Sequence, residues 1–236
     1  VRPTVVSVTT PTSERTDDMI TDEELSGFLA MHQGFRAEFG RLAAACRAPR
    51  DAAHEALLEE QLALVLDVLH LHHTHEDVHL WPYLLERSPE SAWELDTLEL
   101  EHEILAPLIE AAHDIAVPLS GRVAVLERLH RTLNDHLDHE ERVGVPLMLV
   151  HMTPEMVRSD ARKAESEIGR KRMPVVFGWL ASCLNDEQLA IALRQQPALV
   201  RTLFRWFWWP SYERRMRQLY AGTDLGRLTP REGVLR

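Results

Sequence analysis

The sequence predicts an all-α protein, in which an up-down-up-down antiparallel four-helix bundle is followed by a C-terminal helical extension. Three observations support this prediction. Glycine is sparse, with 10 residues among 236. Proline-containing breaks at 48–49, 88–89 and 117–118 divide residues 20–151 into four long segments of helix-forming residues with short connections. The second and fourth segments also repeat one pattern of histidine, glutamate and proline, as expected for two helices that face a shared centre.

The predicted bundle helices begin and end at recognisable signals. Thr21 and Glu24 match a capping box, which predicts the start of the first helix. Ser88 followed by proline predicts the start of the third. With the breaks as ends, the four helices are expected over about residues 21–47, 50–87, 89–116 and 119–152.

Shorter helices are predicted beyond the bundle. Thr153 and Pro154 repeat the cap-plus-proline signal and open a highly charged helix to about residue 172. Further helices are expected over 175–184, 186–195, 198–208 and, after Pro210, 212–220, with Gly222 as a C-cap. The predicted organisation is a disordered arm (1–19), the bundle (20–151), a helical extension packed on the bundle (152–222) and a tail (223–236).

Charge is distributed unevenly along the chain. The net charge is −11, but residues 152–236 hold 15 of the 26 Lys and Arg residues and 9 of the 37 Asp and Glu residues, a net of +6. The remainder therefore carries −17, and we expect the basic extension to dock on the acidic body or to meet an anionic partner.

Other features of the composition concern location. No stretch of 18 apolar residues is present, so no membrane span is expected. The first 18 residues lack the apolar core of a signal peptide, and Cys46 and Cys183 do not make a disulfide framework. A cytoplasmic location is the simplest expectation.

The repeated pattern carries the chemistry of the chain. His72 and Glu76 lie four residues apart, as do His136 and Glu140, and a proline follows each glutamate by six residues. Side chains four apart share one face of a helix, so each imidazole and carboxylate can converge on one point. Neutral nitrogen donors and a negative oxygen donor on a rigid support are what a transition metal needs.

Single histidines, His32 and His102, lie within apolar stripes of the first and third helices. Such a histidine is often a core residue, although a buried histidine then needs a polar partner. For Glu76 and Glu140 the alternative is a solvated helix face, but each lies on the stripe of its histidine, where burial without a cation is costly. We therefore expect all four helices to contribute to one metal site.

Taken together, these segments resemble the hemerythrin-like (HHE cation-binding) proteins over about residues 20–151. The run His72-His73-x-x-Glu76-Asp77-x-x-Leu80-Trp81-Pro82 is similar to that family's H-H-x-x-E-E-x-x-L-F-P run, and His136-x-x-His139-Glu140-Glu141 is similar to its second run. The resemblance implies a non-haem di-iron centre with an oxo or hydroxo bridge. It also implies bridging by Glu76 and Glu140, with His32 and His72 on one iron and His102 and His136 on the other.

One position departs from the oxygen-carrying members of this family. They place a second histidine four residues after the third-helix ligand, and that position is Ala106 here. The resemblance then implies a more open centre, which favours redox chemistry with O2, peroxide or NO over reversible oxygen carriage. A reductant protein would be a partner of such an enzyme. An oxygen, NO or iron sensor or carrier without turnover is the main alternative.

A second metal arrangement uses E-x-x-H pairs, as in ferritin-like di-iron oxidases. Four such pairs occur, ending at His79, His102, His113 and His130, but the first helix offers no acid on its apolar stripe. His79 and Tyr83 follow Glu76 along the ligand stripe. They could donate a hydrogen bond or a proton to a bound oxygen species, or they could be a partly exposed histidine and a core tyrosine.

Two further patterns have several interpretations. The aromatic run of residues 204–209 could stack on nucleic acid, anchor at a membrane interface, or pack the extension against the bundle; we expect packing and no nucleic-acid partner. Pro82, Pro107 and Pro146 lie within predicted helices. They could be tolerated kinks, or they could splay the helices to admit a ligand.

Overall fold

The computed structural model describes residues 19–21 and 23–221, and these residues form helices and turns without a strand. Three predicted features lie outside the described residues. They are the arm (1–19, apart from its last residue), the cap Gly222 and the tail (223–236). Within the described residues, no helix is long and apolar enough to cross a membrane.

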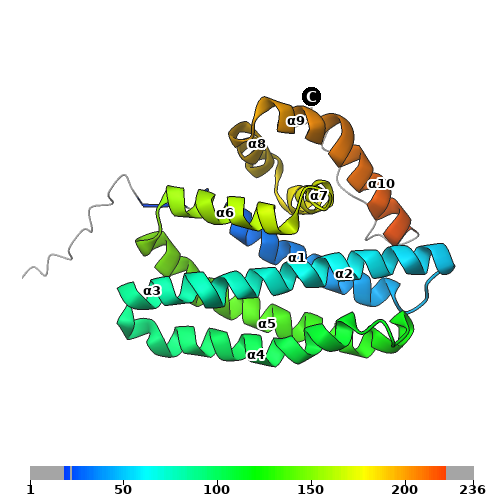
Figure 1. Cartoon of the computed structure of the whole chain (residues 1–236), viewed down its shortest axis with the longest axis horizontal. Coiled ribbons are helices and arrows are strands. Elements are labelled where there is room, and N and C mark those ends of the chain that lie inside the picture. The colour runs from blue at the N-terminus through cyan, green and yellow to red at the C-terminus, as the bar shows by residue number, and fades with distance from the viewer. Residues whose placement is uncertain (1–18, 22, 222–236) are drawn as a thin grey trace, which may run out of the picture.

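Four long helices lie side by side and enclose the site described below (Figure 1). Helix α1 packs against α2 and α5, and α4 packs against the same two helices. The second long helix of the bundle consists of three segments, because α2 continues through a π-helical turn, η1, into α3. The bounds are α1 (Ser26–Ala45), α2 (Ala52–His75), η1 (Glu76–Leu80), α3 (Trp81–Arg87), η2 (Pro89–Ser91), α4 (Ala92–His113) and α5 (Leu119–His151).

These bounds agree with the predicted helices to within a few residues, except at the first N-terminus. The Glu24 carboxylate accepts a hydrogen bond from the Thr21 backbone N–H at 2.9 Å, which is one of the two bonds of a capping box. The Glu24 backbone N–H donates to the Thr21 carbonyl and not to its side chain, so the predicted box is only half formed. Helix α1 nevertheless begins only at Ser26, because residues 23–25 form a turn that buries Leu25. The predicted start was therefore several residues too early.

Internal prolines are accommodated in two ways. The π-helix η1 ends two residues before Pro82, and a second one, η3 (Phe204–Trp208), ends two residues before Pro210. A π-turn widens the helix, which relieves the clash between a proline ring and the preceding turn. Pro107 and Pro146 lie inside helices that continue without such a turn.

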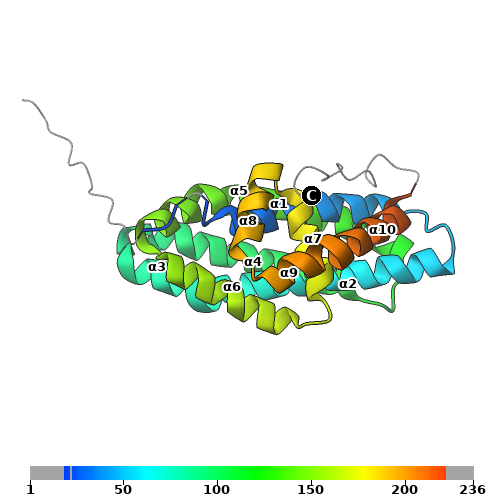
Figure 2. The same cartoon turned by 90° about the horizontal axis from the view of Figure 1, so that it is seen from above.

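The remaining helices lie over one side of the bundle, whereas α4 lies on the opposite side (Figures 1 and 2). Helix α7 packs on α1, and α10 packs on α1 and α2. The predicted break at Pro210 was wrong, because α9, η3 and α10 form one continuous helix. Their bounds are α6 (Pro154–Ile168), α7 (Met173–Cys183), α8 (Asp186–Gln195), α9 (Ala198–Leu203) and α10 (Trp209–Tyr220).

Both apolar and polar contacts hold the extension to the bundle. The Trp179 indole lies against Gly34, where a Cβ would be only 3.0 Å from the ring. The Tyr220 hydroxyl donates to the buried Glu38 carboxylate at 2.7 Å, and the Gln61 amide donates to the same oxygen at 2.8 Å. Arg172 pairs with Asp67 at 2.6 Å, as the charge asymmetry predicts.

The aromatic run only partly follows the prediction that its rings pack inward. Phe204 and Trp209 are buried, and Trp208 is half-buried. Trp206 and Phe207, however, are 64% and 63% exposed. The prediction was wrong for these two rings, because a helix can turn only one stripe of a continuous aromatic run toward its support.

A polar layer divides the apolar core in two. The larger cluster includes Phe35, Leu66, Leu133 and Trp179 and continues into the extension. The smaller cluster, which includes Trp81, lies around α3, the start of α4 and the end of α5. Along the helices, His72, Glu76, His102 and Glu140 of the predicted site lie between the two clusters, whereas His32 and His136 lie at the edge of the larger one.

Candidate metal centre

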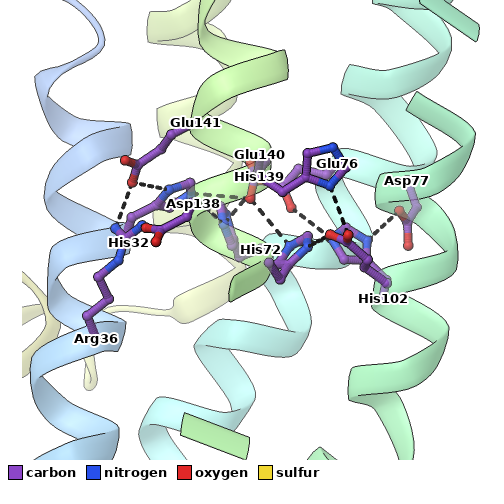
Figure 3. A network of polar contacts seen from close by, with 12 residues as sticks. His32, Arg36, His72, Glu76, Asp77, His102, Asp138, His139, Glu140 and Glu141 are labelled. Atoms are coloured by element: carbon purple, nitrogen blue, oxygen red, sulfur yellow. Dashed lines mark hydrogen bonds and ion pairs between the residues drawn. The ribbon is translucent and has the colours of Figure 1, made fainter. Parts of the chain in front are cut away.

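All six residues predicted as metal ligands meet in this polar layer (Figure 3). They belong to two groups of side chains, and within each group the potential ligand atoms lie within 4.8 Å of one another. One group comes from α1, α2, η1 and α5, and the other comes from α2, α4 and α5. The first group is His32, His72, Glu76 and Glu140, and the second group is His73, His102 and His136.

Carboxylates behind three of the imidazoles fix their orientation. The Nδ1 atom of His32 lies 3.0 Å from Glu141, that of His102 lies 2.6 Å from Asp77, and that of His136 lies 2.9 Å from Glu101. A carboxylate is an acceptor only, so each Nδ1 carries the proton and donates it. The Nε2 atoms, which face the interior, therefore present lone pairs, as in histidines that bind metals.

These inward nitrogens face one another in two pairs. The Nε2 atoms of His32 and His72 are 3.2 Å apart, and those of His102 and His136 are 3.1 Å apart. Two unprotonated nitrogens at this distance repel, whereas a cation shared between them would attract both. The arrangement thus offers two positions for a positive charge.

Each buried glutamate contacts one histidine of each pair. The Glu76 carboxylate lies 3.1 Å from Nε2 of His72 and 3.6 Å from Nε2 of His102. The Glu140 carboxylate lies 3.6 Å from Nε2 of His32 and 3.4 Å from Nε2 of His136. Both carboxylates therefore lie between the two nitrogen pairs, where a bridging carboxylate would be.

The residues fit a bound metal because several of their buried polar atoms make no hydrogen bond with another described residue. Both carboxylate oxygens of Glu76 and of Glu140, and Nε2 of His73, are buried and accept or donate no hydrogen bond among the described residues. Burial of an ionised carboxylate without a hydrogen bond or a counter-charge costs roughly several kcal/mol in a protein. Cations among these atoms would satisfy them together.

Burial and the close approach of other titratable groups shift the pKa values of both glutamates. Burial and the neighbouring charge of Glu140 raise the pKa of Glu76 well above its ordinary value. Burial also acts to raise the pKa of Glu140, but the imidazoles of His32, His136 and His72 prevail and lower it. Burial lowers the pKa of His72 to about 3, so this imidazole is neutral and able to coordinate near neutral pH.

His73 is a residue whose place the sequence analysis missed. It is absent from the ligand set that the family resemblance implies. His73 is buried, and its ring stacks on that of His102 with centroids 4.1 Å apart. Because α4 packs against α2, His73 as well as His72 faces the polar layer.

Sequence reasoning also missed the supporting acids Asp77, Glu101 and Glu141. A local signal for two of them exists, because Asp77 directly follows Glu76 and Glu141 directly follows Glu140. Each of these acids accepts from a histidine of a different helix. Arg36 also donates to Glu141 at 2.7 Å, which holds that carboxylate in place.

Two residues with open interpretations, His79 and Tyr83, make their contacts away from the two groups. His79 is exposed and its ring lies against His75, with centroids 5.6 Å apart. The Tyr83 hydroxyl donates to the backbone carbonyl of His151 at 2.7 Å. A role for either residue in the chemistry stays a prediction, which these contacts do not favour.

The E-x-x-H pairs of the ferritin-like alternative do not converge. Glu127 pairs with Arg47 at the surface, and the ring of His130 contacts the backbone carbonyl of Arg36 at 2.9 Å. His113 pairs with Asp67. Only His102 and Glu76 of the residues in these pairs belong to the two metal-binding groups.

A groove connects the second group to the surface. It lies between α2 and α4, has a volume of about 830 Å³, and has His73 and His102 among its lining residues. Ala106 lies in the wall of this groove, at the position where the oxygen carriers have a further histidine. The small side chain leaves the space open.

Comparison with known proteins agrees with this geometry. The model of the family described as hemerythrin HHE cation-binding domain matches residues 25–148, which is more than half of the chain. No curated protein and no solved structure matches the chain.

Proposed function

Because the chain belongs to the hemerythrin HHE cation-binding family, we propose that it holds a non-haem di-iron centre that reacts with O2, peroxide or NO. The decomposition of hydrogen peroxide is the reaction we regard as the first to test. The observation that carries the proposal is the pair of facing Nε2 contacts, with two buried carboxylates between them that make no hydrogen bond with another described residue. Nitrogen and carboxylate donors in this combination suit non-haem iron.

The proposed ligands follow the two nitrogen pairs. One ion takes His32 and His72, the other takes His102 and His136, and Glu76 and Glu140 bridge them. His73 would add a further nitrogen to the second ion, since its ligand atom lies within 4.8 Å of those of His102 and His136. The ligand set is His32, His72, His73, Glu76, His102, His136 and Glu140.

Other residues support this chemistry by orienting the imidazoles and by leaving a path to the centre. Iron supplies the redox capacity when bound. The carboxylates of Asp77, Glu101 and Glu141 hold the imidazoles in the tautomer that can coordinate. The groove at Ala106 gives a small molecule a path to the second ion.

We also propose that residues 20–151 are the functional domain, with the up-down-up-down antiparallel topology of the predicted bundle. Residues 152–222 are then a helical extension that supplies no ligand. The packing of α1 with α2 and α5, and of α4 with the same helices, supports this division. The extension has no histidine, so its contribution to a nitrogen-rich centre is indirect.

A sensing function is the second candidate, and one contact chain favours it. Trp179 of the extension lies edge-on to Phe35 at 5.4 Å between centroids, and Phe35 lies 5.5 Å from the ring of His72. A change of ligand at the ion held by His72 would reach the extension through two rings. In that case, oxygen or NO binding would alter the packing of α7.

Two measurements on the full chain test these candidates. Anaerobic iron loading followed by metal analysis and an optical spectrum should give two irons per chain; one iron or none would contradict the di-iron centre. Stopped-flow decay of hydrogen peroxide by the loaded protein should show many turnovers. A single-turnover reaction accompanied by a change in Trp179 fluorescence would favour the sensor.

A further inference from the structure

The groove between α2 and α4 has acidic walls. On α4, Glu99, Glu103 and Glu110 line it at intervals of four and seven residues, with Ala106 between the last two. Asp67 and Asp77 line it from the α2 side. No Lys or Arg residue is among its lining residues. A cleft of one charge focuses the field and concentrates counter-ions, which here are cations.

The acids of the groove fall into two kinds. Asp77 accepts from His102, and Asp67 pairs with Arg172. Glu99, Glu103 and Glu110, in contrast, are exposed, and no hydrogen bond or ion pair with another described residue holds them. Three carboxylates without partners in one groove are ready oxygen ligands for a hydrated divalent ion.

A buried group at the floor of the groove points to the same ligand. His73 is 94% buried, since its exposed fraction is 6%, and its Nε2 atom has no hydrogen-bond partner in the described part of the chain. It lines the groove and also belongs to the metal-binding group with His102 and His136. The groove therefore runs from exposed carboxylates to buried imidazoles.

The opposite approach to the centre is covered. His32 is fully buried, with Phe28 at 4.3 Å between ring centroids. His72 lies between Phe28 and Phe35. An ion that entered from this side would have to displace aromatic rings.

We propose that the α2–α4 groove is the loading route of the centre, in which Glu99, Glu103 and Glu110 capture a hydrated divalent cation and pass it to His73. This inference rests on the proposed metal centre. The exposed carboxylates bind weakly and exchange fast, and His73 and His102 bind more tightly because they are neutral nitrogen donors on a rigid support. The ion moves inward because each step exchanges water for stronger ligands.

The test follows the uptake of Co²⁺ by the metal-free full chain, with stopped-flow detection of the absorption bands of bound Co²⁺. The groove variant combines Glu99→Gln, Glu103→Gln and Glu110→Gln. The matched control combines Glu90→Gln, Glu94→Gln and Asp96→Asn, which removes the same charge from exposed positions at and near the start of α4 outside the groove. Both variants keep the proposed ligands.

The groove variant should take up Co²⁺ at least about tenfold more slowly at low ionic strength, and the difference should shrink as salt is added. Final Co²⁺ per chain and the final spectrum should equal those of the wild type, and the control should change the rate less than about twofold. Equal rates for the two variants would overturn the route. A lower final Co²⁺ content in the groove variant would also overturn it, because these acids would then belong to the centre.

A steric variant tests the same route without a change of charge. Ala106→Phe places a ring in the groove and should slow both Co²⁺ uptake and release to a chelator, at low and at high salt. Unchanged rates in this variant would contradict the route. A wild-type chain that takes up no Co²⁺ or Fe²⁺ would instead overturn the proposed metal centre, and the route with it.

Discussion

His102 and His136 come from different helices, yet their Nε2 atoms lie 3.1 Å apart with Glu76 and Glu140 beside them. If both carboxylates bridge two ions, the loss of either one disturbs both ions. We expect Glu76→Ala and Glu140→Ala each to lose both irons together, as measured by metal content per chain after anaerobic loading. The exposed Glu86→Ala is the control. A variant that keeps one full-occupancy iron would show that its glutamate serves a single ion.

The acids that accept hydrogen bonds from the histidines should affect the affinity for metal and leave the number of metal ions per chain unchanged. Asp77→Ala and Glu141→Ala remove the acceptors of His102 and His32, so each ring loses its fixed tautomer. Metal affinity should fall by about 10-fold to 100-fold. Competition with a coloured chelator measures this change. Asp138→Ala is the matched control, because Asp138 accepts from Arg36 and contacts none of the proposed ligands; an equal loss there would contradict a specific role.

The contact between Tyr220 and Glu38 should stabilise the fold without affecting metal binding. Tyr220→Phe removes a hydrogen bond to a buried carboxylate, which should lower the free energy of unfolding by about 1.5–3 kcal/mol. Tyr83→Phe removes a hydrogen bond to a neutral backbone carbonyl and should cost about 0.5–1.5 kcal/mol. Urea denaturation of the metal-free variants gives both values. Iron per chain should stay that of the wild type.

Two glycines offer a matched pair for the packing of the extension. A Cβ on Gly178 would lie 2.6 Å from the Tyr212 ring, whereas a Cβ on Gly27 would have no atom within 4 Å. Gly178→Ala should therefore destabilise the protein by about 1–3 kcal/mol. Gly27→Ala should leave stability the same or slightly higher, because alanine favours helix. Equal melting temperatures for the two variants would show that α7 and α10 can move apart freely.

Stability should fall at alkaline pH. Burial raises the pKa of the Cys46 thiol from 9.0 to about 12, and burial with the charge of Glu38 raises the pKa of Tyr220 well above 10.0. Both groups ionise more readily in the unfolded chain, so their contribution is fully present below pH 9.0 and is lost as pH rises toward 12. Urea midpoints between about pH 8 and 11 measure the decline. Tyr220→Phe should reduce it above pH 10.0; an identical slope would argue against the tyrosine.

The sequence was sufficient to predict the helices and six of the residues that converge, because spacing on one helix decides which side chains share a face. It could not predict contacts that depend on how helices face one another. Glu101 and Glu141 accept from histidines of other helices, and His73 is buried because α4 approaches it. The exposure of Trp206 is a similar case, since composition does not say which side of a helix meets its support.

The polar layer also affects the local unfolding of the protein. Without cations, we expect the buried carboxylates to draw water between the two apolar clusters, which would leave the end that contains Ile20, Trp81 and Met148 to depend mainly on its own small core. Bound ions would join this end to the larger cluster and its extension. Amide hydrogens of α3 should then exchange as a separate, faster unit in the metal-free chain and together with the rest of the bundle once the metal is bound. In this protein the metal would thus set the size of the cooperative folding unit.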